Sequence, residues 1–198
     1  MNNTSVLRAL PAGLILLAAL LSAGCGEEDE PAQVLPPLPD PCAALPASAL
    51  RSLLGTADPE PRLMGIPFTP AAGCALSGDD GAALHLNLVT SERLRASAGK
   101  VDEVAQYYAS NRAAIEKLEG AAPPEQQMGS ARVFWQPGVE VLHVLGEAHY
   151  LTLRWVPADA NSDPLARRAA VQVAAEAALA RLRSGAVPTF KPEAADTE

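Results

Sequence analysis

The stretch that decides the fold is GCALSGDDGAALHLNLV, residues 73–89. Two apolar runs flank a Gly-Asp-Asp-Gly segment, a pattern that is typical of a β-hairpin. In the second run Leu84, Leu86 and Leu88 alternate with other residues, so every second side chain is expected to face a core. The sequence therefore predicts two antiparallel strands joined by a tight turn.

Helices and strands are predicted to alternate along the rest of the chain. Helices are expected where Pro or a capping residue precedes an apolar pattern and Gly follows it, over residues 46–55, 101–118 and 165–183. Strands are expected over residues 62–68, 73–77, 82–89, 131–136, 139–145 and 149–156. The order αβββαβββα predicts an α+β fold, with helices packed on one antiparallel sheet of about five to six strands. The first eight of these elements form two successive αβββ units, although no sequence repeat is visible.

Two predicted helices have a face that is expected to pack against the sheet. In residues 101–118 this face consists of Val101, Val104, Ala105, Tyr108, Ile115 and Leu118. In residues 165–183 it is rich in alanine and consists of Ala166, Ala169, Ala170, Val173 and Ala177.

The first 24 residues have the layout of a secretory signal peptide. Arg8 precedes an apolar run over residues 14–21, and the small residues 22–24 lead to Cys25. The run is shorter than the roughly 20 residues of a membrane span. Its end resembles the lipobox of bacterial lipoproteins, in which the cysteine becomes the lipidated first residue. We therefore expect acyl chains such as palmitate on Cys25; the alternative is a plain secretory signal and an ordinary thiol.

The composition then changes twice along the chain. Residues 25–41 hold four consecutive acidic residues and five prolines, which favour an extended, unpacked chain. We expect residues 25–41 to form a tether, residues 42–185 a single α+β domain, and residues 186–198 a disordered tail. The protein is expected outside the cytoplasmic membrane, on the outer membrane of a Gram-negative cell or the outer face of the plasma membrane otherwise.

The chain has three cysteines, and lipidation of Cys25 leaves Cys42 and Cys74. Disulfides persist in an extracytoplasmic compartment, so we expect these two residues to be bonded. Such a bridge would close a loop of about 30 residues and stabilise the fold by roughly 3–4 kcal/mol. The alternative is two separate buried thiols.

The charge balance argues against nucleic acid and anionic lipid head groups as direct ligands. The chain has 23 acidic and 15 basic residues, a formal charge of −8. Removal of residues 1–24 would leave 23 acidic and 14 basic residues, a charge of −9. A field of this sign repels nucleic acid and anionic lipid head groups, so neither is expected as a direct ligand.

Three histidines are the candidate metal or catalytic residues. His85 lies on the polar side of its predicted strand, and His143 and His149 flank the last predicted hairpin. A two-residue loop starting at Gly146 would place the last two rings on opposite faces of the sheet, and a three-residue loop would place them on one face. Glycine at the first loop position favours the shorter loop. Zinc needs three or four ligands, which this pattern lacks, so no metal or cofactor is expected.

Aromatic residues are concentrated on the last three predicted strands, as Phe134, Trp135, Tyr150 and Trp155. Core packing is the expected role of aromatic residues in strands, and an exposed member would form a platform for a ligand.

The segment Asp40-Pro41-Cys42 followed by a short helix and a second cysteine, Cys74, resembles a family of bacterial lipoproteins common in actinobacteria. Mature domains of that family open with an Asp-Pro-Cys motif, and the resemblance covers about residues 40–183. It implies a disulfide, a lipid anchor and an α+β domain. It implies no activity, because the family has no established function.

The expected function follows from the anchor and from the absence of catalytic motifs. The chain contains no H-E-x-x-H, G-x-S-x-G, P-loop or dinucleotide-binding glycine motif. We therefore expect a non-catalytic binding or assembly module of the cell envelope, with an envelope protein or a small apolar molecule as partner. The alternative is an envelope hydrolase whose catalytic residues are scattered in sequence.

Overall fold

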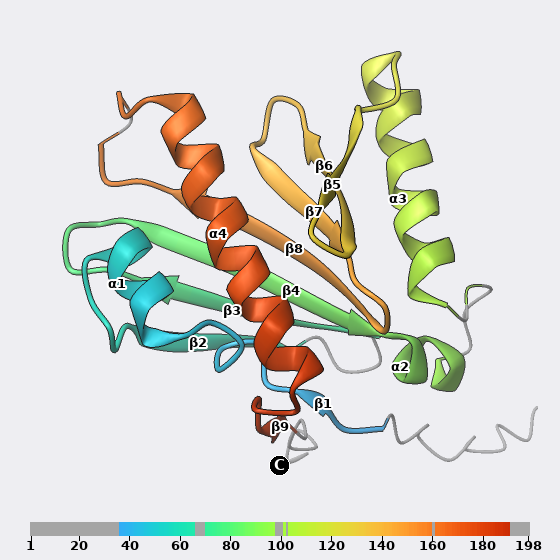
Figure 1. The fold of residues 1–198 in the computed structure, drawn as a ribbon, viewed down its shortest axis with the longest axis horizontal. Coiled ribbons are helices and arrows are strands. Elements are labelled where there is room, and N and C mark those ends of the chain that lie inside the picture. Colours follow the sequence, from blue (N-terminus) through green and yellow to red (C-terminus); the bar gives the residue numbers. More distant parts are fainter. Residues whose placement is uncertain (1–35, 66–69, 98–100, 102, 160, 191–198) are drawn as a thin grey trace, which may run out of the picture. The chain divides into compact units, whose positions relative to one another are not determined.

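The computed structural model describes residues 36–65, 70–97, 101, 103–159 and 161–190 (Figure 1). Its helices are α1 (Ala47–Leu54), α2 (Ser91–Ala96), α3 (Val104–Glu119) and α4 (Pro164–Arg183). Its strands are β1 (Leu38–Pro39), β2 (Glu60–Gly65), β3 (Ala71–Ser77), β4 (Ala83–Thr90), β5 (Glu125–Met128), β6 (Ala131–Gln136), β7 (Val141–Leu145), β8 (His149–Val156) and β9 (Thr189–Phe190). The predicted signal peptide, Cys25 and residues 191–198 lie outside the described residues.

Seven strands form one antiparallel sheet in the order β2-β3-β4-β8-β7-β6-β5. The predicted α+β class with an antiparallel sheet is thus confirmed, and the sheet has more strands than expected. Strand β5 was not predicted because three of its four residues are polar and exposed. The helix α2 was also missed; Thr90 is its N-cap, and the Thr90 hydroxyl accepts a hydrogen bond from the Arg93 backbone N–H.

The sheet consists of two meanders that meet at its centre. The hairpin predicted around residues 78–81 joins β3 to β4, and Asp80 accepts a hydrogen bond from the Ala82 backbone within its turn. The second meander runs from β5 to β8. Strands β4 and β8 pair over their whole length, with Leu86 opposite Leu153. The last strand of the sheet in the sequence therefore occupies its middle.

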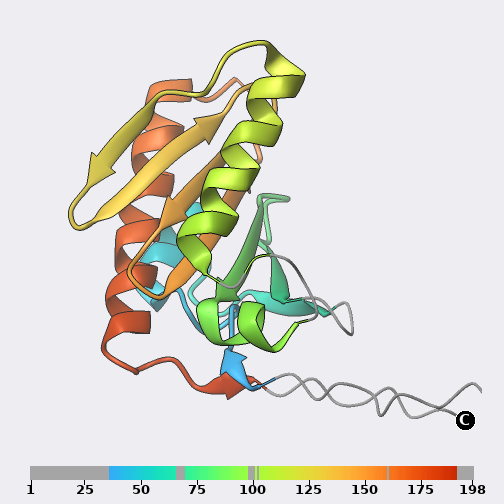
Figure 2. The same ribbon diagram turned by 90° about the vertical axis from the view of Figure 1, so that its right-hand side faces the viewer.

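Helices cover both faces of the sheet. Helices α1 and α4 lie on one face, where the strands contribute Leu76, Leu84, Leu86, Leu88, Leu142, Val144, Leu151 and Leu153 to the main core. Helices α2 and α3 lie on the other face, seen in front in Figure 2, over a second cluster that includes Tyr108, Phe134 and Tyr150. The predicted alternation in β4 is confirmed, since its leucines are buried and Asn87 is exposed.

The predicted packing faces of the two long helices are corrected. In α3, Val104, Tyr108 and Ile115 are buried as expected, whereas Leu118 is 82% exposed. In α4 the predicted alanine face is wrong, because Val173 is 66% exposed. The buried face consists of Val171, Ala174, Ala175, Ala178, Leu179 and Leu182. Alanine occurs around the whole helix, so the large aliphatic residues decide which side is buried.

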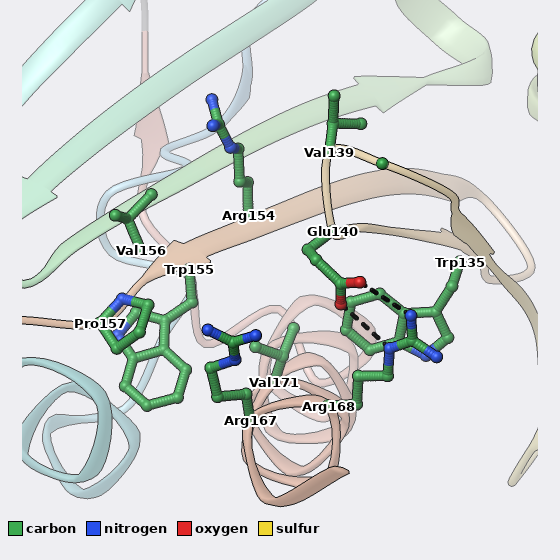
Figure 3. Close-up of a pocket in the computed structure, with 11 residues that line it drawn as sticks. Trp135, Val139, Glu140, Arg154, Trp155, Val156, Pro157, Arg167, Arg168 and Val171 are labelled. Atoms are coloured by element: carbon green, nitrogen blue, oxygen red, sulfur yellow. Dashed lines mark hydrogen bonds and ion pairs between the residues drawn. The ribbon is translucent and has the colours of Figure 1, made fainter. Parts of the chain in front are cut away.

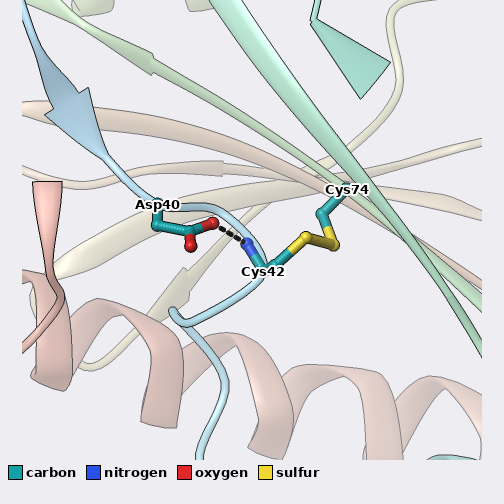
Figure 4. The surroundings of a disulfide bond; sticks show 3 residues. All are labelled: Asp40, Cys42 and Cys74. Atoms are coloured by element: carbon teal, nitrogen blue, oxygen red, sulfur yellow. Dashed lines mark hydrogen bonds between the residues drawn. A yellow bond between two sulfur atoms is a disulfide. The ribbon is translucent and has the colours of Figure 1, made fainter. Parts of the chain in front are cut away.

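Cys42 and Cys74 form a disulfide, with their Cα atoms 5.2 Å apart (Figure 4). The bridge connects the segment before α1 to the middle of β3. The Asp40 carboxylate accepts a hydrogen bond of 2.8 Å from the Cys42 backbone N–H and closes the turn that presents the cysteine. The predicted disulfide is therefore confirmed.

The two ends of the described chain meet in the short β1–β9 pair, with Leu38 opposite Phe190. The Asp40 N–H donates a hydrogen bond of 2.7 Å to the Pro188 carbonyl, and Val187 is buried against the main core. The prediction of a disordered tail from Ala186 is therefore wrong for residues 187–190. Leu38, predicted within the tether, is likewise fully buried. Among the described residues, no helix is long and apolar enough to cross a bilayer.

Candidate functional site

A pocket lies between the first turns of α4, the β6–β7 turn and the end of β8 (Figure 3). Its volume is about 240 Å³. Asp163 is the N-cap of α4, and its carboxylate accepts a hydrogen bond from the Leu165 N–H. Pro164 is the first residue of the helix. This start places Arg167 and Arg168 beside the pocket. The lining residues are Trp135, Gly138, Val139, Glu140, Arg154, Trp155, Val156, Pro157, Arg167, Arg168 and Val171.

One side of the pocket is formed by an ion pair over an aromatic ring. The Nε and Nη2 atoms of Arg168 donate hydrogen bonds of 3.0 and 2.8 Å to the two carboxylate oxygens of Glu140. The same guanidinium lies over the Trp135 ring, 5.4 Å from its centroid. The hydrogen bonds from Arg168 hold the pKa of Glu140 below its usual range. Arg168 is therefore already engaged by two partners within the protein, Glu140 and Trp135.

Glu140 itself adopts an unusual backbone conformation. Its φ of 51° lies in the left-handed region, and it is the only residue other than glycine with a positive φ in the described part of the chain. This conformation costs about 1–2 kcal/mol for a residue with a Cβ atom. The turn therefore holds the Glu140 carboxylate against Arg168 at the expense of local strain.

Arg167 differs from Arg168 in acting on Glu140 only at longer range: its charge helps to lower the pKa of that carboxyl without a direct contact. Its side chain makes no hydrogen bond or ion pair with the described residues, and it extends between Trp155 and the Glu140–Arg168 pair (Figure 3). Arg154 also borders the pocket, but Figure 3 shows its side chain pointing to the side of the sheet opposite α4. Among the described residues, the Arg167 guanidinium is therefore the cation that faces the pocket without a directly bound carboxylate.

The remaining walls are apolar. Trp135 and Trp155 are both half-buried and come from the strand face that carries the main core. The lining is completed by Gly138, Val139, Val156, Pro157 and Val171. The sequence had indicated the two tryptophans as core residues or a ligand platform, and the structure places both around the pocket.

His143 lies in the second core cluster rather than in the pocket. Its Nδ1 and Nε2 atoms lie 2.5 Å from the Tyr150 hydroxyl and 3.2 Å from Gln136 Oε1, and its ring stacks on Phe134. The neutral ring satisfies this arrangement when Nδ1 accepts from Tyr150 and the Nε2–H donates to Gln136. Burial lowers the pKa of His143 to about 4, so the ring is neutral at pH 7.

The three histidines do not converge. Leu145 pairs with Tyr150, and Gly146 donates to the His149 carbonyl, so the last hairpin has Glu147 and Ala148 as its loop residues. The predicted loop starting at Gly146 is therefore wrong by one residue. A two-residue loop starting at Gly146 would pair Val144 with His149, whereas Val144 pairs with Leu151. Because the pairing is shifted by two residues, each side chain keeps its predicted face, and His143 and His149 lie on opposite faces as predicted.

His85 is paired with Arg154 on β8. Within the described part of the chain, no group of three or more His, Cys, Asp or Glu side chains is arranged to hold a metal ion.

Sequence reasoning did not identify Glu140, Arg167 or Arg168. Each is a single charged residue in a turn or an Ala-rich helix, where charges are usually solvated. The sequence carries one weak signal for these pocket residues. Two adjacent arginines lie in the first turns of a helix, where acidic residues are favoured.

Comparison of the chain with models of protein families, with curated proteins and with solved structures finds no match. The candidate site is therefore interpreted from its geometry alone.

Proposed function

We propose that this protein is a lipid-anchored, non-catalytic binding module of the cell envelope, and that the pocket beside α4 binds a small anionic molecule. The observation that carries the proposal is the Arg167 guanidinium, which faces the pocket and forms no hydrogen bond or ion pair within the part of the chain that the structure describes. A chain of net charge −8 has many carboxylates with which to neutralise an arginine. A cation left without one is suited to a ligand that supplies the negative charge.

The pocket favours an anion over the small apolar ligand expected from the sequence. An apolar molecule would leave the guanidinium of Arg167 partly desolvated and without a new partner, which is unfavourable. A carboxylate or phosphate would form charge-assisted hydrogen bonds with it instead. The proposal therefore keeps the expected binding role and changes the class of ligand.

The alternative of an envelope hydrolase receives less support. A serine hydrolase needs a histidine beside a nucleophile and an acid. His143 is 5% exposed and its two ring nitrogens are engaged by Tyr150 and Gln136. His85 and His149 lie on different strands and on opposite faces of the sheet.

The binding proposal is tested with the full chain purified from a bacterial host. Melting temperatures are measured with a panel of small carboxylates, phosphates and sulfates, and each hit is titrated by calorimetry. We expect at least one anion to raise the melting temperature of the wild-type protein and not that of Arg167→Ala. Arg51→Ala removes an exposed arginine on α1, outside the pocket, and is the control. Anion binding that survives in Arg167→Ala would contradict the proposed site.

The anchor is tested separately, because it rests on the sequence of residues 1–25 and on the resemblance to Asp-Pro-Cys lipoproteins. We expect the wild-type protein to enter the detergent phase in a phase-partition assay, and Cys25→Ser to stay in the aqueous phase. Mass spectrometry should find an acylated peptide that begins at Cys25. A native product that retains residues 1–24 would show that the protein has no lipid anchor.

A further inference from the structure

We infer that the ligand of this pocket is a small aromatic monocarboxylate. This inference rests on the proposed function and makes it more specific, because it names both the charge of the ligand and its apolar part. It follows from three properties of the site: the number of cations that remain for a ligand, the size of the cavity, and the nature of its walls.

The number of available cations points to a single negative charge. Arg168 donates two hydrogen bonds to Glu140, and the Arg154 side chain points away from α4 (Figure 3). Of the arginines that line the pocket in the described part of the chain, Arg167 remains, and its planar guanidinium matches one carboxylate in a bidentate geometry.

Glu140 acts as a specificity-determining residue in this arrangement. Its carboxylate lies in the pocket wall beside the space into which Arg167 extends (Figure 3). A second negative charge on the ligand would lie close to it, and the two like charges would repel, although solvent and Arg168 reduce the repulsion. The ion pair thus disfavours dicarboxylates and the dianion of phosphate.

The volume of the cavity fits one aromatic ring with a short acidic substituent. A cavity of roughly 150 Å³ holds a benzene molecule. The pocket measures about 240 Å³, which leaves room for a carboxylate and about one methylene group. The pocket is open to solvent on one side, so this volume sets the size of the part of the ligand that it encloses.

The walls favour a flat apolar group. The Trp135 ring is covered by Arg168, so Trp155 is the aromatic surface that remains for a ligand ring. Aromatic rings pack against tryptophan in offset or edge-on arrangements, and Val139 and Val171 supply further apolar surface. A ligand that places its ring on Trp155 and its carboxylate on Arg167 would use both features at once.

The protein provides its own reporter for the test. The chain has two tryptophans, and both line the pocket. Intrinsic tryptophan fluorescence of the full chain is therefore titrated with phenylacetate, and calorimetry confirms each dissociation constant. Four comparison compounds test these properties: phenylacetamide lacks the charge, acetate lacks the ring, phthalate has a second carboxylate and no methylene, and inorganic phosphate has neither a ring nor a carboxylate.

We expect phenylacetate to bind about tenfold or more tightly than each of the four. Arg167→Ala should weaken phenylacetate binding by about tenfold to a hundredfold, as expected for loss of a charged hydrogen-bond pair. Arg167→Lys should retain part of the affinity because it keeps the charge and loses the fork. Arg51→Ala should bind as the wild type does. Circular dichroism shows whether each variant is folded.

The outcomes separate this inference from the proposed function. Acetate, phthalate or phosphate binding as tightly as phenylacetate, with the same dependence on Arg167, would retain the anion site and overturn the aromatic monocarboxylate. Phenylacetamide binding equal to that of phenylacetate would overturn the role of charge and hence both. If phenylacetate, acetate, phthalate and phosphate all fail to bind at millimolar concentration, this inference and the proposed function are both contradicted.

Discussion

The Nδ1 atom of His143 on β7 lies 2.5 Å from the hydroxyl oxygen of Tyr150 on β8. The two residues are diagonal neighbours, because His143 is paired with Thr152. Burial raises the pKa of Tyr150 and lowers that of His143, so the phenol keeps its proton and the imidazole accepts from it. This buried polar pair connects the two strands beneath α3.

The neutral state of His143 predicts that the fold loses stability in acid. Its pKa is about 4 in the folded protein and 6.5 in the unfolded chain. The unfolded state therefore binds a proton first, and the stabilisation present above pH 6.5 is lost as the pH falls toward 4. We expect the free energy of unfolding to fall by about 2–3 kcal/mol between pH 7 and about pH 4.5, measured by urea titration.

Two variants assign this pH dependence. His143→Gln should be less stable than the wild type at pH 7 but should lose much less stability on acidification. Burial also lowers the pKa of His149, so His149→Gln should remove a part of the slope in the same direction. An unchanged slope in His143→Gln would show that His143 is not the group responsible.

Removal of the disulfide should destabilise the domain without changing its fold. The bridge spans 32 residues, and closing a loop of that length contributes roughly 3–4 kcal/mol to stability. We expect the double variant Cys42→Ala/Cys74→Ala to lose about this amount in urea titrations, and reduction of the wild type to have the same effect. Cys25→Ser is the control and should unfold as the wild type does. Equal stability of the oxidised and reduced proteins would contradict the prediction.

Loss of the Glu140 charge should broaden the ligand range of the pocket. Glu140→Gln keeps the shape of the side chain and frees Arg168 from its carboxylate. We expect phthalate and phosphate to bind about tenfold more tightly to this variant, about 1.4 kcal/mol, because a nearby like charge is removed. Both side chains are partly exposed, so stability should fall by about 1 kcal/mol or less. Calorimetry measures the affinities, and unchanged discrimination against phthalate would exclude Glu140 as the determinant.

The segment after α4 should contribute to stability although the sequence predicted disorder there. Val187 is 6% exposed and packs in the main core. Val187→Ala removes about two buried carbon groups and should cost about 1.5–2.5 kcal/mol. Val173→Ala makes the same change at an exposed position of α4 and should be neutral within about 0.5 kcal/mol. Equal effects of the two substitutions in thermal melts would show that β9 and its flanks are not packed.

The class of fold was predictable because the strongest patterns are local. The leucines of β4 alternate strictly, and the Gly-Asp-Asp-Gly turn reverses the chain between two apolar runs. The start of α4 was readable from Asp163 and Pro164 for the same reason. Strand β5 carries no such pattern, since its residues are held by pairing with β6 and not by burial.

The pocket was not predictable because its parts are distant in the sequence. Trp135 comes from β6, Glu140 from the β6–β7 turn, Trp155 from the end of β8, and Arg167 from α4. A local pattern reports which residues are apolar, and the tryptophans were noted on that basis. It does not report which arginine will receive a carboxylate partner, because that depends on how the β6–β7 turn meets the helix.

The central position of β8 has a consequence for how the chain is made. On the proposed export route, the first meander leaves the cytoplasm about 60 residues before β8, the strand that must pair with β4. Until then one edge of β4 has open hydrogen-bonding groups, and its leucines have no neighbouring strand. Both sulfurs of the disulfide, by contrast, belong to the first half. We therefore expect the disulfide to form after export and before β8 closes the sheet, so that a cross-linked half-sheet precedes the complete one.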